Sequence, residues 1–265
     1  MAWTLTPEQR RDIESFLDRV RADAPPKALD RLDSALAMFV AGKQTWPGAH
    51  PLQRPVLYVP GLTAQPWHVP QTLDAVALLE ASWREIADEL ESMLQRRAGF
   101  QPYEHHAEAA LAPGNEWMAM YFAVGGQPIE PNRRLCPRTA AVLDRIPNLS
   151  ETAIFSELKP GVHLKPHCGL WNCRLTIHLG LIVPSQTGIR VGGEAREWRA
   201  GECLVFDDSF LHEAWNLSDR IRVVLLLDVW HPDLTPVEVQ VLSTIQRWFA
   251  NRSRMIDHVI NGQIA

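Results

Sequence analysis

Apolar residues recur every three to four positions over 13–20 and again over 29–42, which is typical of amphipathic helices. Thr6 and Gln9 flank Pro7 in the pattern of a capping box, so the first helix should begin there. We expect these two segments to pair as a helical hairpin packed on the main body. The same spacing predicts two further helices, over 78–93 and 235–249.

The pattern changes in the second half of the chain, where apolar residues gather in short runs separated by glycine and proline. A run at 54–59 also reads as a strand, followed by a proline-rich loop, and Gly192 with Gly193 indicates a tight turn. Helices first and short strands afterwards predict an antiparallel barrel or jelly roll supported by helices. The expected strands of this half are 117–124, 152–158, 173–183, 202–207 and 221–230.

Composition narrows the class of protein. With 265 residues, 46% of them hydrophobic, the chain can bury a large core, which excludes intrinsic disorder. The net charge is −5 and no basic run exceeds a pair, so we expect no nucleic-acid partner. The longest apolar runs are too short to span a bilayer, and we expect no membrane association. The four cysteines lack the spacing of a disulfide framework, which favours a reduced, cytoplasmic protein.

One expected strand is polar on a single face. In 173–183, Arg174, Thr176 and His178 alternate with leucine and isoleucine, and successive strand residues point to opposite faces. No acidic residue accompanies them in this strand. A strand with one apolar and one cationic face predicts that the cationic face lines a pocket.

Two kinds of metal site are compatible with the nearby histidines. A structural zinc site could use His163, His167, Cys168 and Cys173, but their spacing fits no standard pattern. A redox metal in a jelly roll normally has two histidines and one carboxylate as ligands. His167 could be the first of these histidines and His212 the second, although Gly169 stands where the carboxylate is expected. Spacing alone leaves open that these are core histidines without a metal.

Three blocks of sequence resemble the aspartyl/asparaginyl β-hydroxylase family of iron- and 2-oxoglutarate-dependent oxygenases. They occur in the family's order, and the resemblance covers roughly residues 57–233. It implies a mostly β fold with flanking helices, namely a double-stranded β-helix (a cupin-like jelly roll). We therefore expect an N-terminal helical extension over 1–45 and an oxygenase domain with a C-terminal helix over 46–265. The blocks are "PGVHLKPHCGLWNCRLTIHLGLIVP", "WRAGECLVFDDSFLHEAW" and "RIRVVLLLDVWHP".

The resemblance also implies roles for individual residues. This branch of the family holds iron with two histidines and no carboxylate, which assigns His167 and His212 as iron ligands. Matching positions for 2-oxoglutarate are Ser156, His178 and Arg222, and Arg174 matches a position near the acidic group of the substrate. Thr176 departs from the pattern, because protein-modifying members often have an arginine there.

The implied cofactor is Fe(II), with 2-oxoglutarate and O2 as cosubstrates. The implied reaction is hydroxylation of an unactivated carbon, such as Cβ of an Asp or Asn residue or a related unit, so we expect an acidic small-molecule, amino-acid or peptide substrate. Three alternatives stay open: a hydroxylase of a small metabolite or lipid, a halogenase that uses the space at Gly169, and a ligand-binding jelly roll without activity. Asp207 and Asp208 are expected to be caps at a strand end rather than metal ligands.

Overall fold

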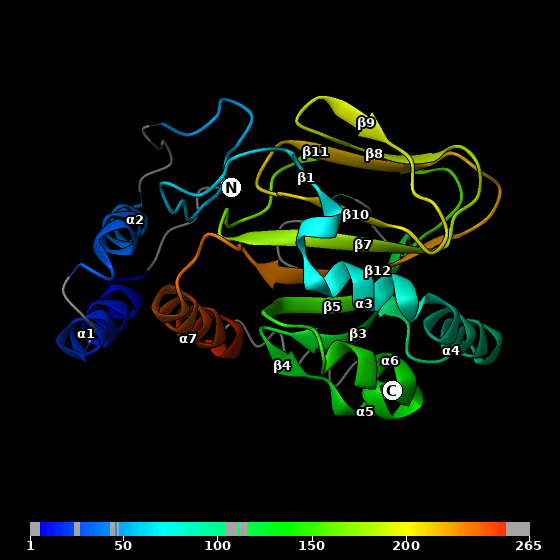
Figure 1. Ribbon diagram of the computed structural model, residues 1–265, viewed down its shortest axis with the longest axis horizontal. Coiled ribbons are helices and arrows are strands. Elements are labelled where there is room, and N and C mark those ends of the chain that lie inside the picture. Colours follow the sequence, from blue (N-terminus) through cyan, green and yellow to red (C-terminus); the bar gives the residue numbers. More distant parts are fainter. Residues whose placement is uncertain are drawn as a thin grey trace.

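A computed structural model describes residues 6–23, 27–42, 46, 48–103, 111 and 116–252. Two antiparallel sheets dominate it (Figure 1). The larger sheet has the strand order β1 (Trp67–His68), β10 (Cys203–Phe206), β7 (Arg174–Ile182), β12 (Arg222–Trp230), β5 (Leu149–Leu158), β3 (Trp117–Val124) and β2 (Gln101–Pro102), with β4 (Gln127–Pro128) paired to β3. The smaller sheet has the order β6 (Val162–His167), β11 (His212–Asn216), β8 (Thr187–Val191) and β9 (Glu194–Arg196).

From β5 to β12 the chain passes alternately through the two sheets, apart from the hairpin of β8 and β9 within the smaller sheet. Strands β5, β7, β10 and β12 belong to the larger sheet, whereas β6, β8 and β11 belong to the smaller one. This alternation is the winding of a double-stranded β-helix, so the predicted mostly β fold with flanking helices is confirmed. Gly192 and Gly193 both have positive φ and form the predicted turn, between β8 and β9.

Helices cover the outer face of the larger sheet (Figure 1). The single helix expected over 78–93 is divided at Ser82, a correction to the sequence-based prediction. Trp83 begins the second of the two helices and packs over Gly201, where a Cβ atom would approach the indole ring to 3.0 Å. The elements on this side are η1 (Pro70–Thr72), α3 (Asp74–Ala81), α4 (Trp83–Arg96), α5 (Glu130–Leu135) and α6 (Pro137–Leu143).

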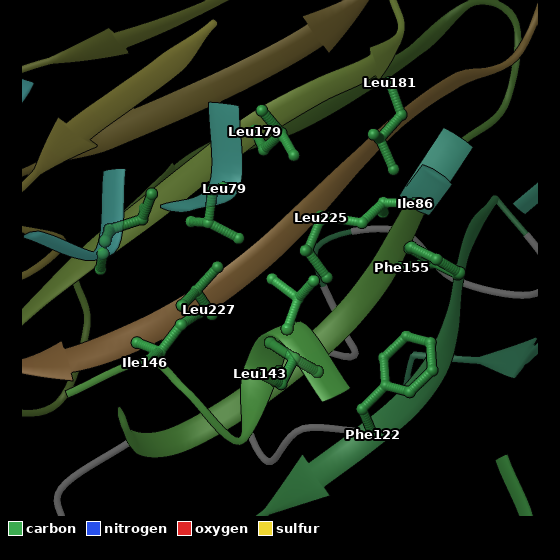
Figure 2. Close-up of a cluster of buried hydrophobic side chains, with 14 of the residues drawn as sticks. Leu79, Ile86, Phe122, Leu143, Ile146, Phe155, Leu179, Leu181, Leu225 and Leu227 are labelled. Carbon is green, nitrogen blue, oxygen red and sulfur yellow. The ribbon is translucent and has the colours of Figure 1, made fainter. Parts of the chain in front are cut away.

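The core beneath these helices is formed by alternate residues of the central strands (Figure 2). Leu175, Ile177 and Leu179 of β7 face the helices and are fully buried. The Phe122 and Phe155 rings of the neighbouring strands meet edge to face, with centroids 4.8 Å apart. The apolar face predicted for β7 therefore packs on helices, which leaves the opposite face for the space between the sheets.

Between the two sheets lies a second apolar cluster, which includes Tyr121, Ile154 and Val224 of the larger sheet and Ile189 of the smaller. None of the four strands of the smaller sheet was among the expected strands, and two of them, β6 and β11, carry His167 and His212. Their sequences, VHLKPH and HEAWN, are polar and partly exposed, and so lack the apolar run that marks a buried strand. The strand expected at 54–59 is also wrong, because Leu57 forms only an isolated bridge, to Trp171.

The N-terminal helices α1 (Pro7–Asp23) and α2 (Asp30–Val40) pack with the C-terminal helix α7 (Pro236–Arg252) beside the sheets (Figure 1). The capping box is present: the Thr6 N–H donates to Gln9 Oε1 at 2.8 Å, and the Gln9 N–H donates to Thr6 Oγ1 at 3.2 Å. Arg31 of α2 forms a two-pronged ion pair with Glu238 of α7, at 2.6 and 2.7 Å. The domain boundary expected after residue 45 lies outside the described residues. None of the described helices is long and apolar enough to cross a membrane.

Candidate active site

A cavity opens between the two sheets, and all six residues singled out from the sequence line it. They come from both sheets: His167 and His212 from the smaller, and the others from β5, β7 and β12 of the larger. The six are His167, His212, Ser156, His178, Arg222 and Arg174. The polar face predicted for β7 thus faces the cavity.

The two histidines expected to bind a metal lie directly opposite each other. His167 ends β6 and His212 begins β11; they are register partners, and their ring centroids are 4.1 Å apart. His167 Nδ1 donates to the Lys165 carbonyl at 2.7 Å and His212 Nδ1 donates to the Phe210 carbonyl at 2.9 Å, since a carbonyl can only accept. Both Nε2 atoms consequently keep their lone pairs when the rings are neutral.

Burial favours the neutral ring that a metal ligand needs. Desolvation, reinforced by the neighbouring His167, lowers the pKa of His212 to about 3. Two imidazoles, each held by a carbonyl at Nδ1, are a suitable donor set for Fe(II) or a similar transition metal. Within the described residues no group of three or more His, Cys, Asp or Glu side chains is arranged to hold a metal ion, so the four-residue zinc alternative is not formed.

Asp207 and Asp208 have different environments. Asp207 caps its turn as expected: its carboxylate accepts hydrogen bonds from Gln53 Nε2 at 2.9 Å and from the Ser209 N–H at 2.9 Å, and burial raises its pKa to about 7. Asp208 instead lines the cavity. A Cβ atom built on Gly169 would lie only 2.2 Å from Asp208 Oδ2. The carboxylate of Asp208 therefore occupies the space that a side chain at position 169 would need.

At the other side of the cavity, Arg222 is 2% exposed and makes no ion pair with any described residue. Its Nη1 donates to the Ser156 carbonyl at 3.2 Å, its guanidinium lies 4.7 Å from the Trp198 ring centroid, and its Nε has no hydrogen-bond partner. Burial lowers its pKa to about 9, opposed by the charge of Glu157, with which it forms no ion pair. A buried guanidinium that lacks an ion-paired carboxylate is costly unless a ligand supplies one.

Two tryptophans set the donor roles of His178 and Ser156. Trp198 Nε1 donates to His178 Nδ1 at 3.2 Å, so the neutral ring carries its proton on Nε2, which is buried and has no partner among the described residues. Trp117 Nε1 donates to Ser156 Oγ at 3.0 Å, which leaves the hydroxyl proton available. Arg222, His178 and Ser156 thus offer donors to an anion. Sequence reasoning missed both tryptophans, because each comes from a distant segment.

Two acidic side chains line the cavity, one from β5 and one from β12. The sequence did not predict either of them. The Arg174 guanidinium forms an ion pair with Glu151 and lies 5.4 Å from the ring centroid of Trp171. Thr176 Oγ1 donates to Asp228 Oδ1 at 3.0 Å. Burial raises the pKa of Asp228, opposed by the nearby charge of Arg174. The only sequence signal for Asp228 is a single acid within the apolar run 223–230.

Comparison with known proteins identifies the family. The family model described as aspartyl/asparaginyl beta-hydroxylase matches residues 80–232. The aspartyl/asparaginyl beta-hydroxylase of Mus musculus is 36% identical over 205 residues, which are 73% of this chain and 27% of the mouse protein. The ornithine lipid ester-linked acyl 2-hydroxylase of Rhizobium tropici is 36% identical over 170 residues, 62% of this chain and 60% of that protein.

A solved structure of a prolyl hydroxylase from Trichoplax adhaerens aligns with 64% of this chain and 82% of that chain, with 10% identity and a TM-score of 0.42, too low to support an inference. The sequence matches are much stronger, at 36% identity to the mouse protein. They cover the strands that carry the two histidines, Ser156, His178 and Arg222. This chain belongs to the aspartyl/asparaginyl beta-hydroxylase family.

Proposed function

We propose that this protein is an Fe(II)- and 2-oxoglutarate-dependent oxygenase that hydroxylates an unactivated carbon. The observation that carries the proposal is that one cavity holds two histidines whose Nδ1 atoms are fixed by carbonyls and a buried Arg222 that forms no ion pair with any described residue. A two-carboxylate cosubstrate can bind at a metal through one end and at a guanidinium through the other. Family membership supports the same activity.

His167 and His212 would hold the iron, because their Nδ1 atoms are fixed by carbonyls and their Nε2 atoms are available. Bound there, Fe(II) would activate O2 and couple the decarboxylation of 2-oxoglutarate, to succinate and CO2, with hydroxylation of the substrate. Arg222 would bind the distal carboxylate of 2-oxoglutarate, since a guanidinium offers a planar pair of donors. Ser156 and the Nε2–H of His178 would add single hydrogen bonds.

Buried aromatic side chains in the cavity wall and behind it protect these contacts from water. Trp117, Trp198 and Phe206 are all buried, and they surround Ser156, Arg222 and His178. In such a low-dielectric site, charge-assisted hydrogen bonds are stronger than at the surface. The residues of this chain therefore bind and orient the cosubstrate and exclude water.

The carboxylate of Asp208 beside Gly169 bears on the halogenase alternative. A halide at that position would meet the negative charge of Asp208, so the geometry favours hydroxylation over halogenation. For the substrate, an amino-acid unit and a lipid acyl chain both have support in the names of relatives: one relative is an aspartyl/asparaginyl hydroxylase and another a lipid hydroxylase. The oxygenase activity itself can be tested without the natural substrate.

The test is slow uncoupled turnover. Purified protein with Fe(II), ascorbate, O2 and 2-oxoglutarate should form succinate, and removal of O2 should stop it. His167→Ala should abolish this activity, whereas His163→Ala should retain it, because His163 Nε2 pairs with Glu213 rather than lining the cavity. Folded, metal-supplemented protein that forms no succinate would favour the non-catalytic ligand-binding alternative.

A further inference from the structure

We propose that the substrate carries a free ammonium group, as a free amino acid does and an acidic residue inside a peptide does not. This inference rests on the proposed oxygenase function and specifies its substrate. It concerns the Arg174 end of the cavity, defined by Glu151, Thr152, Arg174, Thr176 and Asp228.

This end lies apart from the proposed 2-oxoglutarate site along the same strands. Arg222 and Asp228 stand at opposite ends of β12, roughly 20 Å apart at the usual rise of a strand. On β5, Ser156 pairs in register with Val224, near Arg222, whereas Glu151 lies in the part of the strand opposite Asp228. The Arg174 end therefore faces the part of the cavity that remains for the substrate.

A β-bulge brings Glu151 into the cavity. The β5–β12 register shifts between the pairs Leu227–Ala153 and Val229–Leu149, so three residues of β5 oppose Asp228 alone. Consecutive strand residues normally point to opposite faces, yet Glu151 and Thr152 both line the cavity. Bulges commonly re-aim side chains next to active sites. The backbone of β5 thus places the Glu151 carboxylate at this end of the cavity.

The charges here do not suit a purely acidic ligand. Two carboxylates, Glu151 and Asp228, face a single guanidinium, that of Arg174, which is already paired with Glu151. If Asp228 is protonated, the three groups sum to zero, and if it is ionised they sum to −1. In neither state is there an excess of positive charge. A ligand with an ammonium group would meet carboxylates, while its own carboxylate could reach Arg174.

Thr176 adds no positive charge to the Arg174 end. An arginine here would supply a second cation, but the threonine is neutral and its hydroxyl is committed to Asp228. Arg174, 6% exposed, keeps its Nε without a hydrogen-bond partner within the described part of the chain. The Arg174 end therefore has one donor without a partner for an anionic or carbonyl group. It also has two carboxylates that already accept from Arg174, Thr176 and Thr152 and that a ligand cation would share. That combination matches an amine next to a carboxyl or carbonyl group.

The experiment compares matched ligands on the intact protein, loaded with Mn(II) and 2-oxoglutarate without O2. The probes are the free L-amino acids, their N-acetylated counterparts, an Asp-containing peptide and, as an amine-bearing lipid, phosphatidylethanolamine in detergent micelles. The shift in Tm reports binding, and succinate formation with Fe(II) and O2 reports stimulation. We expect a free-amine probe to bind at least about tenfold more tightly than its N-acetylated form, and the micelles separate a lipid headgroup from a free amino acid.

Three variants sharpen the test. Glu151→Gln keeps the shape of the side chain, removes its charge, and should reduce the preference for the free amine by about tenfold. Thr176→Arg should shift the preference towards N-acetylated and dicarboxylic probes. Glu194→Gln is the matched control, since Glu194 pairs with Arg196 at the surface, and it should leave the preference unchanged.

The outcomes separate the two proposals. If 2-oxoglutarate is still converted to succinate but acetylated or peptide probes bind as well as free amines, the ammonium proposal is overturned and the oxygenase function stands. The same conclusion follows if no free-amine probe binds, or if Glu151→Gln leaves the preference intact in folded protein. If neither succinate formation nor a Tm shift by 2-oxoglutarate is observed, the proposed function itself fails.

Discussion

Single hydrogen bonds decide what each polar residue of the cavity can offer to a ligand. Carbonyls fix the tautomers of His167 and His212, and an indole N–H fixes that of His178. In each case the partner belongs to the surrounding wall and leaves the other ring nitrogen for the ligand. Two predictions at this scale concern the wall and the guanidinium it surrounds.

Trp198→Phe should weaken 2-oxoglutarate binding while keeping an aromatic ring beside Arg222. The variant removes the N–H that holds His178 in its Nε2–H form. Because a typical hydrogen bond contributes about 0.5–1.5 kcal/mol, the KM for 2-oxoglutarate should rise up to about tenfold. Trp215→Phe is the control, because Trp215 contacts His163 and Arg190 rather than His178 or Arg222. Equal KM values for both variants and the wild type would show that the Trp198–His178 bond has no role in binding.

Arg222→Ala should raise the KM for 2-oxoglutarate by roughly two to three orders of magnitude. Loss of one partner from a buried ion pair costs about 3–5 kcal/mol, at about 1.4 kcal/mol per tenfold change. Arg222→Lys should restore only part of the loss, because a point charge cannot form the two-pronged contact. Keto acids that lack the distal carboxylate should improve relative to 2-oxoglutarate in the alanine variant. An unchanged KM would remove Arg222 from the binding site.

At the scale of elements, the alternation along β7 was the most informative pattern in the sequence. Its period of two correctly separated Leu175, Ile177 and Leu179, which face the helices, from Arg174, Thr176 and His178, which face the cavity. The bulge in β5 could not be predicted in this way, because it interrupts that period and aims Glu151 at the cavity. The strands β6 and β11 were missed because both are short and polar: β6 alternates buried and exposed residues only over 162–165, and β11 has two buried residues.

Strand β1 provides a prediction of pH dependence. Burial and the neighbouring His231 lower the pKa of His68 to about 4, whereas an unfolded histidine titrates near 6.5. Between these values the unfolded chain binds more protons than the folded one, so stability should fall as the pH drops from 6.5 towards 4. His68→Gln should lessen this loss by about 1–2 kcal/mol. Urea unfolding at pH 7.5 and pH 5 measures it, and an identical pH dependence in both proteins would contradict the assignment.

At the scale of the whole molecule, the fold and most of the candidate site could be anticipated from the sequence. The three sequence blocks contain His167, His178, His212 and Arg222, and the structure brings these together from four strands. What could not be anticipated depends on contacts between distant segments. Trp117 donates a hydrogen bond to Ser156, which is 39 residues away in the sequence. Glu151 forms its ion pair with Arg174 from a β-bulge. Beside the helix break at Ser82, Trp83 likewise contacts a distant residue, Gly201.

The N-terminal helices should contribute to stability without entering the chemistry. Arg31→Ala leaves the Glu238 carboxylate, 2% exposed, without its guanidinium partner. We expect a loss of about 1–3 kcal/mol in the free energy of unfolding, with an unchanged KM for 2-oxoglutarate. Arg21→Ala is the control, since its ion pairs are exposed and should contribute less than about 1 kcal/mol. A large change in KM for Arg31→Ala would show that α2 supports the cavity.

The central claim is that His167 and His212 hold iron in the cavity whose far side binds 2-oxoglutarate. Anaerobic titration of Fe(II)-loaded protein with 2-oxoglutarate, followed by visible absorption, tests it most directly, because a keto acid chelated to Fe(II) produces a weak charge-transfer band. We predict the band in the wild type, its loss in His212→Ala, and a shift of its midpoint to much higher 2-oxoglutarate concentration in Arg222→Ala. Its absence from folded, iron-loaded wild-type protein, or its persistence in His212→Ala, would contradict the account.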